Sequence, residues 1–557
     1  MKRLFFVFST LAVFSAGAQA LTVKMAPGEK WWGVCSAFGR DMPFTEKSRF
    51  RLDLRRENCL HQTLSFLCSD KGRAVWCPRP FAVNISGGVM RLESDDAEIT
   101  LRGDAGKTLA EAFRCASGTW FPPSGTSPDE LFFSAPQYNT WSELIYNQNE
   151  KDILTYAKSM LDNGLPPGIF MIDENWQHGF GVWEFDMRKF SDPKGMVEKL
   201  HGMGFKVLLW VCPFVAMDTL EYHRVAWGER VDRLGGWPTK GGFLTSSLRP
   251  SRGGVPPAAP VNWWEGTSAL LDFSHPNAVA WFTEQLDRLV RDYKVDGFKF
   301  DGGEVHHYAP TMLQDGVPGK MYAYDRKLFP AEQSALYAAF ALKYPVSEVR
   351  NAYGMAGKPM ILRLHDKPHR WNAVQRLVPD MIAAGMIGCP FICPDLVGGG
   401  SYTSFLKGSK YDQELFVRYA QIAALSPMMQ ISASPWRLLD ERHQKLYKEA
   451  VALRQKFAPK IVALVRQAGR DGEPILRNLE YNFPAMGYAD VKDEFMLGTD
   501  ILVAPVVVKG QTERNVLLPP GHWRGDDGKE YDGPAKITVS APLERLPYFI
   551  RFPSRQP

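Results

Sequence analysis

The chain has 557 residues, a formal net charge of +5, 45% hydrophobic residues and 23% charged residues. This length is too great for one ordinary domain, and it is sufficient for a barrel with smaller flanking domains. The modest charge and the lack of a polybasic run argue against nucleic acid or anionic lipid as a partner.

The first residues have the pattern of a signal peptide. Lys2 and Arg3 precede a short apolar run, and the small residues Ala18 and Ala20 follow it. The alternative, a membrane anchor, requires roughly 20 apolar residues, which is more than this run contains. We therefore expect residues 1–20 to be cleaved and the protein to be exported to the periplasm or the medium. No later stretch of the sequence is apolar for long enough to span a membrane.

Residues 21–125 are predicted to form an N-terminal β-sandwich. Short runs of alternating apolar and polar residues, such as 66–81 and 89–101, are separated by Gly, Asp and Pro. This pattern is typical of antiparallel strands that bury one face.

Cysteines are concentrated in this region of the sequence. Five lie near the N-terminus (Cys35, Cys59, Cys68, Cys77, Cys115) and three lie later (Cys212, Cys389, Cys393). In an oxidising compartment the first group could form disulfides, for example between Cys68 and Cys77 across a hairpin. No set of cysteines has the spacing of a zinc site.

Residues 126–467 alternate short apolar runs with segments of helical period. Eight candidate strands begin near Gln137, Gly168, Phe205, Gly297, Val346, Pro359, Gly388 and Met428. Eight strands separated by helices predict a (β/α)8 TIM barrel. A long insertion, residues 217–263, follows the third strand, and we expect it to shape the mouth of the barrel. Residues 468–557 return to β-like runs, so the predicted fold class is α/β, with a TIM barrel between an N-terminal β-sandwich and a C-terminal β domain.

The segment KVDGFKFDGGE, residues 294–304, ends the fourth predicted barrel strand. The alternation of a strand places Lys299 and Asp301 on the same side, at the strand end where barrel enzymes hold their catalytic groups. The neighbouring cation favours the ionised carboxylate, which suits a nucleophile. A structural ion pair or a helix cap is the alternative for Asp301.

Other polar and aromatic residues stand at or near predicted strand ends: Trp141, Asp173, Trp176, Trp264, Arg350 and Asp366. Carboxylates among aromatic rings are typical of a sugar site, since a sugar ring offers both hydroxyl groups and apolar faces. Alternatively, Asp366 is a turn residue and the tryptophans belong to the core. The adjacent histidines His306 and His307 do not suggest a metal site, because neighbouring side chains point apart.

Five ordered segments of the sequence resemble glycoside hydrolase family 31. KFDGGE is similar to the nucleophile motif of that family, LHDKPHRW to its acid/base segment, and GCPFICPDLVGGG to its following strand and glycine loop. Residues 182–215 and DEFMLGTDILVAPVVVKG resemble the segments before the active site and after the barrel. The resemblance implies a retaining α-glycosidase with Asp301 as nucleophile and Asp366 as acid/base. An enzyme of this kind needs no metal or other cofactor, because two carboxylates suffice for the reaction.

The identity of the sugar depends on Lys299. KFD resembles the Lys-x-Asp strand end of α-galactosidases in families 27 and 36, and MIDENWQ resembles their Asp-Asp-Gly-Trp segment, with Glu174 and Asn175 as departures. Within family 31 this combination is similar to the branch of bacterial α-galactosidases and the mammalian myogenesis-regulating glycosidase. The resemblance implies an α-galactosidase acting on an oligosaccharide or glycan. The implied substrate-binding residues are Trp141, Asp173, Trp176, Trp264, Lys299, Arg350 and Asp395. An α-glucosidase, an α-xylosidase, a transglycosylase and a carbohydrate-binding pseudoenzyme are the alternatives.

Overall fold

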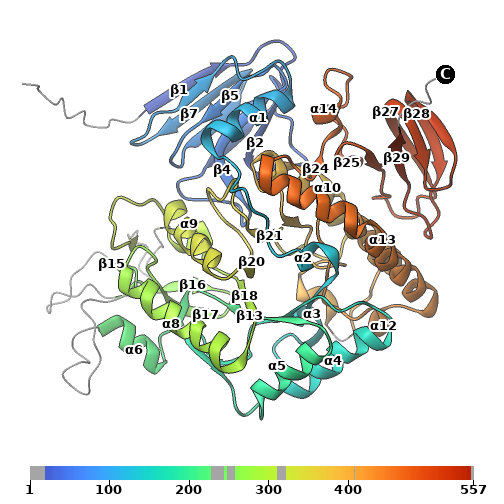
Figure 1. The fold of residues 1–557 in the computed structure, drawn as a ribbon. Helices are drawn as coiled ribbons and strands as arrows, with labels where there is room; N and C mark the ends of the chain where they lie inside the picture. Colours follow the sequence, from blue (N-terminus) through green and yellow to red (C-terminus); the bar gives the residue numbers. More distant parts are fainter. Residues whose placement is uncertain (1–18, 228–243, 248–257, 310–320, 407, 553–557) are drawn as a thin grey trace, which may run out of the picture.

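The computed structural model describes residues 19–227, 244–247, 258–309, 321–406 and 408–552. It contains an N-terminal pair of β-sheets, a central barrel and a C-terminal β-sheet (Figure 1). The predicted fold class is therefore confirmed. The predicted signal peptide lies outside the described residues, except that Gln19 and Ala20 begin the first strand. None of the helices in the described ranges is both long and apolar enough to cross a membrane.

The N-terminal part consists of two four-stranded antiparallel sheets. One has the order β1 (Gln19–Lys24), β7 (Val89–Ser94), β6 (Ala82–Ser86) and β3 (Phe50–Asp53), and the other has the order β2 (Trp31–Cys35), β4 (Thr63–Ser69), β5 (Ala74–Trp76) and β8 (Thr100–Arg102). Alternate residues of β6 and β7 are buried, as expected where one face covers a core. All residues of β2 and β4 are buried, because helices α1 (Leu109–Trp120) and α10 (Trp371–Met386) also contact this second sheet.

Strands β4 and β5 form the predicted hairpin, but it does not join Cys68 to Cys77. Cys68 pairs with Ala74, whereas the N–H of Cys77 donates to the carbonyl of Ser65 at 3.0 Å. The two cysteines therefore lie at different levels of the hairpin, and all eight cysteines are free thiols in the structure. The Cys68–Cys77 disulfide prediction is wrong, because cysteine spacing alone did not fix the strand register.

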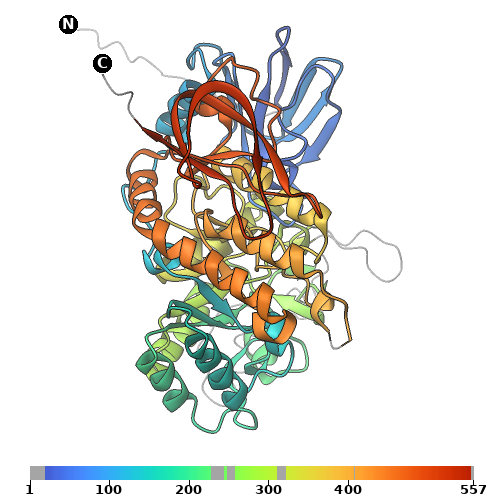
Figure 2. The same ribbon diagram turned by 90° about the vertical axis from the view of Figure 1, so that its right-hand side faces the viewer.

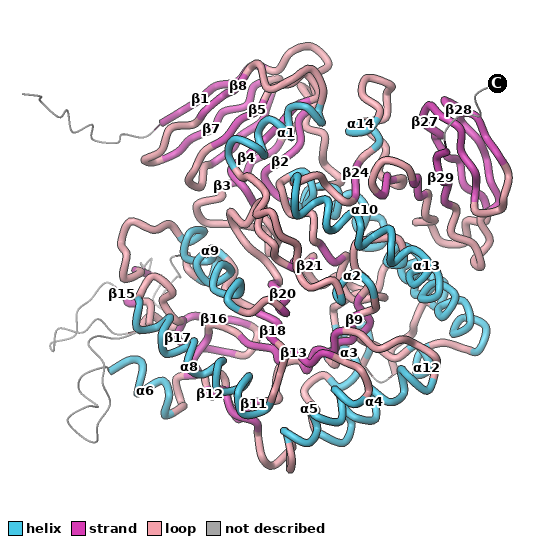
Figure 3. The backbone as a smooth tube through the Cα atoms, in the orientation of Figure 1, coloured by secondary structure: helices cyan, strands magenta, loops and turns pink. Residues whose placement is uncertain are grey.

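Eight parallel strands form the barrel, in the order β22-β21-β20-β18-β13-β10-β9-β23. They are β9 (Gln137–Asn139), β10 (Ile169–Ile172), β13 (Lys206–Val211), β18 (Gly297–Phe300), β20 (Val346–Val349), β21 (Ile361–Arg363), β22 (Ile392–Cys393) and β23 (Gln430–Ile431). A single parallel bridge between Leu396 and Gln430 brings the two edges together. Each predicted strand contains or directly precedes an observed one. Figure 3 shows β9, β13, β18, β20 and β21 between α8 and α9 on one side and α10 and α13 on the other.

Helices alternate with most of the barrel strands, beginning with a short helix before β9. They are α2 (Leu131–Ser134), α3 (Trp141–Leu144), α4 (Glu150–Asp162), α5 (Pro193–Gly202), α6 (Leu220–Trp227), α8 (Pro276–Tyr293), α9 (Pro330–Phe340), α10, α11 (Gln413–Ala424), α12 (Pro435–Leu438) and α13 (Glu441–Asp471). In α8 the buried residues Ala278, Phe282, Leu286 and Leu289 recur every three or four positions, which gives the helix one apolar face. No helix connects β20 to β21, whose connecting residues 350–360 are all described.

Small antiparallel sheets and hairpins lie in the segments that follow the barrel strands. The described ones are the hairpin β11 (Gln177–Gly179) and β12 (Val182–Phe185), the pair β15 (Ser246–Ser247) and β19 (Met321–Tyr322), and the sheet of β14 (Phe214–Ala216), β17 (Gly266–Leu270) and β16 (Val261–Trp263). The insertion predicted at residues 217–263 follows β14. Its residues 228–243 and 248–257 lie outside the described ranges.

A six-stranded sheet closes the chain, in the order β24 (Leu476–Arg477), β25 (Phe495–Leu497), β26 (Ile501–Val503), β29 (Tyr548–Phe552), β27 (Glu513–Gly525) and β28 (Glu530–Ser540). Part of this domain has a hydrophobic core of its own, which includes Leu479 of the short helix α14 (Leu479–Asn482), Trp523 and Phe549. Both β domains lie at the same end of the molecule in the two views (Figures 1 and 2).

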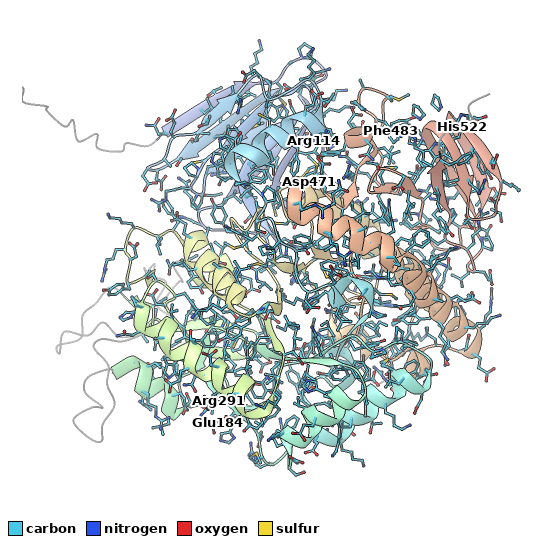
Figure 4. The ribbon with its side chains drawn as sticks, in the orientation of Figure 1. Arg114, Glu184, Arg291, Asp471, Phe483 and His522 are labelled. Carbon is cyan, nitrogen blue, oxygen red and sulfur yellow. The ribbon has the colours of Figure 1, made fainter. Side chains whose placement is uncertain are left out.

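The N-terminal domain makes polar contacts with the rest of the chain at several points. Figure 4 shows Arg114 of α1 beside Asp471 at the end of α13, and Arg114 forms an ion pair with Glu473. Near the barrel, the N–H of Thr63 donates to the carbonyl of Ala352, and the N–H of Gly354 donates back to Thr63. Residues of β4 thus bind the backbone between β20 and β21, where the barrel has no helix.

Candidate active site

Functional side chains gather where four barrel strands end. Asp173 follows β10, Asp301 follows β18, Arg350 follows β20, and Asp366 lies shortly after β21. These strands are neighbours or near neighbours in the sheet order β10-β13-β18-β20-β21. Parallel strands end on the same face of a barrel, so residues far apart in the sequence meet there.

Asp301 lies at the centre of this cluster. Its Oδ1 accepts hydrogen bonds from the N–H of Gly302 and from Arg350 Nη1, each at 2.9 Å, and its Oδ2 accepts one from Trp210 Nε1 at 2.9 Å. Lys299 Nζ lies 3.7 Å from Oδ2. Burial disfavours the charge, but Arg350 and Lys299 outweigh this and hold the pKa of Asp301 below its ordinary value. Asp301 is therefore an ionised, immobilised carboxylate, as a nucleophile requires.

Lys299 and Asp173 form a buried ion pair beside Asp301. Lys299 Nζ donates to Asp173 Oδ2 at 2.7 Å, and each side chain is only 3% exposed. Burial lowers the pKa of Lys299, but Asp173 and Asp301 raise it by more, so the ammonium group is charged. The other oxygen of Asp173 accepts from the N–H of Glu174 at 3.0 Å. This pair presents one fixed donor group and one fixed acceptor group next to the nucleophile candidate.

Arg350 connects the two predicted catalytic carboxylates. Its Nη1 donates to Asp301 Oδ1 at 2.9 Å, and its Nη2 lies 3.6 Å from Asp366 Oδ2. Nη2 also lies 2.9 Å from His365 Nδ1, which must then accept the hydrogen bond. Burial and Arg350 lower the pKa of His365 to about 4, consistent with a neutral ring. Because a guanidinium is compact and planar, the two carboxylates that approach it lie close to each other at this end of the barrel.

Asp366 is the more accessible of the two carboxylates, with its side chain 25% exposed against 7% for Asp301. Arg363 Nη1 donates to Asp366 Oδ1 at 2.7 Å. Burial opposes ionisation, but Arg350 and Arg363 hold the pKa of Asp366 below its ordinary value. Asp366 is therefore an anion in the free site. It can act as a base directly, and it must gain a proton before it acts as an acid.

Asp395 supports the site from below. Its oxygens accept from Arg363 Nη1 at 2.7 Å, from the N–H of Lys367 at 2.7 Å and from the N–H of Gly400 at 2.9 Å. The side chain is fully buried, and the backbone φ of 104° is unusual for a residue other than glycine. The side chain has no exposed surface and both its oxygens are already bonded in this structure, so its assignment to substrate binding stays a prediction. Asp395 positions Arg363, which in turn holds Asp366.

Gly400 leaves the room that this arrangement needs. A Cβ atom at position 400 would lie 2.5 Å from Asp366 Oδ1 and 2.6 Å from Asp395 Oδ1. The sequence showed a run of glycines here, but it could not show that two carboxylates pack against the last of them.

Trp264 lies at the rim and is 43% exposed. Its Nε1 donates to Glu174 Oε2 at 3.0 Å, and the guanidinium of Arg350 lies 5.4 Å from the centre of its ring. Burial and the adjacent Asp173 raise the pKa of Glu174 well above its ordinary value. The ring therefore stands against the polar cluster with much of its surface open to a ligand.

Trp141 is partly exposed, and its ring packs edge-on against Tyr146 and Tyr402 at 5.7 and 5.2 Å between centres. Trp176 differs, since it has no exposed surface and its Nε1 donates to the carbonyl of Trp210 at 2.8 Å. Trp176 therefore has no surface that a substrate could reach in this structure, and its predicted contact with substrate stays a prediction. Its indole packs beneath the site and supports the strand that carries Trp210.

Three further side chains at the site were not assigned a role from the sequence. They are Trp210, Glu304 and His365, which contact Asp301, His307 and Arg350 respectively. Trp210 pairs in register with Lys299, so the sheet alignment would have found it, whereas the sequence shows only an aromatic residue near a strand end. Within the described part of the chain, no group of three or more His, Cys, Asp or Glu side chains is arranged to hold a metal ion.

Two known proteins are similar to this chain in sequence. The mouse myogenesis-regulating glycosidase is 29% identical over 485 residues, which are 83% of this chain and 64% of that protein. Alpha-xylosidase XylQ of Lactiplantibacillus pentosus is 25% identical over 414 residues, which are 69% of this chain and 49% of that protein. The chain thus spans less than two thirds of the length of either relative.

A solved α-xylosidase from a soil metagenome, complexed with xylose, superposes on the structure with a TM-score of 0.79 at 21% identity, covering 96% of this chain and 79% of that one. Residues 135–464 match the Glycosyl hydrolases family 31 TIM-barrel domain. Residues 472–553 match the Glycosyl hydrolase family 31 C-terminal domain. The chain therefore belongs to glycoside hydrolase family 31.

Proposed function

We propose that this protein is a retaining α-glycosidase that releases terminal α-linked galactose from an oligosaccharide or glycan. Membership of family 31 supports glycoside hydrolysis. One observation carries the choice of galactose, namely the buried pair of Lys299 and Asp173, joined at 2.7 Å directly beside Asp301. A lysine two residues before the nucleophile is the feature that this chain shares with α-galactosidases.

In the first step Asp301 attacks the anomeric carbon while Asp366 protonates the leaving oxygen. Gly302, Trp210 and Arg350 hold both oxygens of Asp301, so the attacking carboxylate is preorganised. The bond from the anomeric carbon to the leaving oxygen breaks as the bond to Asp301 forms. The product is a covalent glycosyl-enzyme.

In the second step Asp366 removes a proton from water, which attacks the anomeric carbon and releases Asp301. Esterified Asp301 carries no charge, so Arg350 then has one fewer anion to balance. Its remaining attraction for Asp366 favours the anion, which is the form required of a base. The shared guanidinium therefore links the charge of one carboxylate to the proton affinity of the other.

The Lys299–Asp173 pair supports selection of the axial 4-hydroxyl of galactose. A hydroxyl in the matching position can accept from the ammonium group and donate to the carboxylate. Glucose, the epimer with an equatorial 4-hydroxyl, would leave the remaining hydrogen-bonding positions of this buried pair without a partner. Each group left unpaired in this way costs about 1–3 kcal/mol. Selectivity of this kind is larger than a purely apolar pocket provides.

Hydrolysis of α-xylosides is the second candidate, because proteins named α-xylosidase are among the relatives and the structural neighbours. Xylose has no C6 group and an equatorial 4-hydroxyl. It would not use the Lys299–Asp173 pair in the way proposed for galactose. α-Glucoside hydrolysis, glycosyl transfer and sugar binding without catalysis would use the same rim.

Turnover of p-nitrophenyl α-galactoside, α-glucoside and α-xyloside tests the proposal. We expect kcat/KM for the galactoside to exceed the others by about 100-fold or more. Asp301→Ala should reduce turnover by about 10⁴-fold or more and still bind galactose in calorimetry. Turnover of the glucoside or xyloside with none of the galactoside would refute the sugar assignment. Unchanged turnover in Asp301→Ala would refute the nucleophile assignment.

A further inference from the structure

A loop of the N-terminal domain, residues 58–63, holds the strand ends that carry the site. Gln62 Nε2 donates to the carbonyl oxygens of Arg350 and Arg363, each at 3.0 Å. Asn58 Nδ2 donates to Asn351 Oδ1 at 2.9 Å. These bonds fix the backbone from which the two arginines reach the catalytic carboxylates. The loop therefore occupies the position where β20 and β21 have no connecting helix.

His61 extends this contact to the site itself. Its ring lies edge-on to that of His365, with 5.8 Å between centres, and its Nδ1 lies 2.8 Å from the carbonyl oxygen of Cys59. His365 in turn contacts Arg350 at 2.9 Å. A displacement of the backbone at Cys59 would therefore be transmitted to Arg350 through the rings of His61 and His365.

The loop has an unfavourable backbone conformation at this point. Cys59 and Leu60 have φ values of 52° and 60°, so two successive residues with side chains lie in the left-handed region. Such conformations cost free energy and persist where the surroundings hold them. A covalent link at Cys59 would supply that restraint.

Cys35 is the residue placed to provide the link. It ends β2 and is fully buried, and its Sγ lies 3.7 Å from the carbonyl oxygen of Asn58, the residue bonded to Cys59. The thiol of Cys59, which is partly exposed, lies near enough to that of Cys35 for the two to influence each other's ionisation. The neighbouring Cys35 lowers the pKa of the Cys59 thiol, whereas burial raises that of Cys35. The accessible thiol is thus also the more readily ionised one, as thiol–disulfide exchange requires.

We propose that Cys35 and Cys59 form a disulfide that locks residues 58–63 against the barrel. The oxidant is another disulfide, supplied by a small molecule or an oxidoreductase. The Cys59 thiolate attacks it, forms a mixed disulfide and releases one thiolate. Cys35 then loses its proton and attacks the Cys59 sulfur, which releases the second thiol. Overall two protein thiols are oxidised and one external disulfide is reduced to two thiols. The proposal does not depend on which sugar the enzyme cleaves.

Peptide mapping tests the link. The full-length protein would be treated with oxidised glutathione, blocked with N-ethylmaleimide and digested without reductant. We expect a peptide pair joined through Cys35 and Cys59, and alkylation of both after dithiothreitol. Alkylation of both cysteines after oxidation would overturn the proposal. A glutathione adduct that stays on Cys59 would do so as well, because it shows that Cys35 cannot reach it.

Thermal unfolding tests the lock. Oxidised wild-type protein should unfold about 3 °C or more above the reduced protein. Cys59→Ser should show no such difference. Cys115→Ser is the matched control, since Cys115 is also partly exposed but lies in α1, so it should behave like the wild type. If oxidised and reduced wild-type protein unfold at the same temperature, the disulfide does not lock the loop.

Discussion

At the level of single residues, two arginines set the charge of the site. Arg350 binds Asp301 and approaches Asp366, and Arg363 binds both Asp366 and Asp395. Removing one partner of such a buried network leaves an uncompensated charge, so each arginine requires its carboxylates. The consequence for chemistry is that both predicted catalytic carboxylates are anions before substrate binds. The acid step then depends on a proton that Asp366 holds weakly.

Asp366→Ala should separate the two chemical steps. For a galactoside with an unactivated leaving group, kcat/KM should fall by about 10³-fold, because nothing protonates the leaving oxygen. p-Nitrophenyl α-galactoside should lose much less in the first step, since its leaving group needs little protonation. Azide should restore turnover of that substrate and give the α-galactosyl azide. Formation of the β-azide would contradict the assignment of Asp366.

The same variant should change the pH profile. Because Arg350 and Arg363 lower the pKa of Asp366, its protonated fraction falls steadily as the pH rises. Wild-type kcat/KM on an unactivated galactoside should therefore decrease with rising pH. The residual activity of Asp366→Ala should lack this dependence on pH. If the variant keeps the wild-type slope, Asp366 is not the group that controls the pH profile.

At the level of elements, hydrophobic patterning predicted all eight barrel strands, because each is a short apolar run between helical segments. The strand ends then predicted Asp173, Lys299, Asp301 and Asp366 as neighbours. Burial of Trp176 and Asp395 could not be predicted, since it depends on how loops pack beneath the site. Neither Trp210 nor Gly400 was found, because their contacts arise from sheet register and loop conformation.

Gly400→Ala should impair catalysis more than folding. The added Cβ would press on Asp366 Oδ1 and Asp395 Oδ1, and both carboxylates are held by Arg363. We expect kcat to fall by about 10-fold or more, because misplacing a catalytic group slows the chemical step. The change in KM should be smaller. Gly118→Ala is the control, because a Cβ there meets nothing within 4 Å. Equal kcat values in the two variants would show that Gly400 has no special role.

Glu494 makes the stability of the C-terminal domain depend on pH. Burial raises its pKa to about 8, against about 4.3 in an unfolded chain, and both oxygens accept from the N–H of Leu517 at 3.1 and 3.2 Å. The folded state therefore keeps a proton that the unfolded state releases, so stability falls as the pH rises between these values. The slope is at most about 1.4 kcal/mol per pH unit.

Glu494→Gln should remove this dependence. Urea unfolding at pH 5 and pH 8 measures the difference in the free energy of unfolding. Glu513→Gln is the control, because Glu513 is exposed on the same sheet and should keep the wild-type slope. A wild-type slope in Glu494→Gln would show that Glu494 is not the titrating group.

At the level of the whole molecule, the N-terminal domain is part of the active-site structure. The sequence predicted the order of the domains but not this role, because contacts between residues nearly 300 positions apart leave no local pattern. Gln62 is separated by 288 residues from Arg350 and by 301 from Arg363, and it binds the backbone of both. Gln62 belongs to no sequence motif. Its contacts become visible only in the structure, where no helix connects β20 to β21 and Gln62 binds the backbone at the ends of both strands.

Gln62→Ala should therefore lower activity from a different domain. Two buried carbonyl oxygens lose their donor, and the strand ends that carry Arg350 and Arg363 gain freedom. We expect kcat to fall by about 10-fold while the circular dichroism spectrum is unchanged. Gln467→Ala, at a partly exposed position of α13, should leave kcat unaffected. An unaltered kcat in Gln62→Ala would show that these contacts of the N-terminal domain do not contribute to catalysis.

The gap between β20 and β21 also bears on how the molecule is made. A ribosome completes residues 58–63 long before it reaches their partners near residue 350, and domains synthesised first generally fold first. The N-terminal domain can thus present a finished docking edge to strands that emerge later. Gln62 then bonds to the backbone of Arg350 and Arg363, at the ends of the fifth and sixth barrel strands. We therefore expect the active site to be among the last parts of the molecule to assemble, and a barrel produced without residues 58–63 would lack the hydrogen bonds that hold the backbone of Arg350 and Arg363.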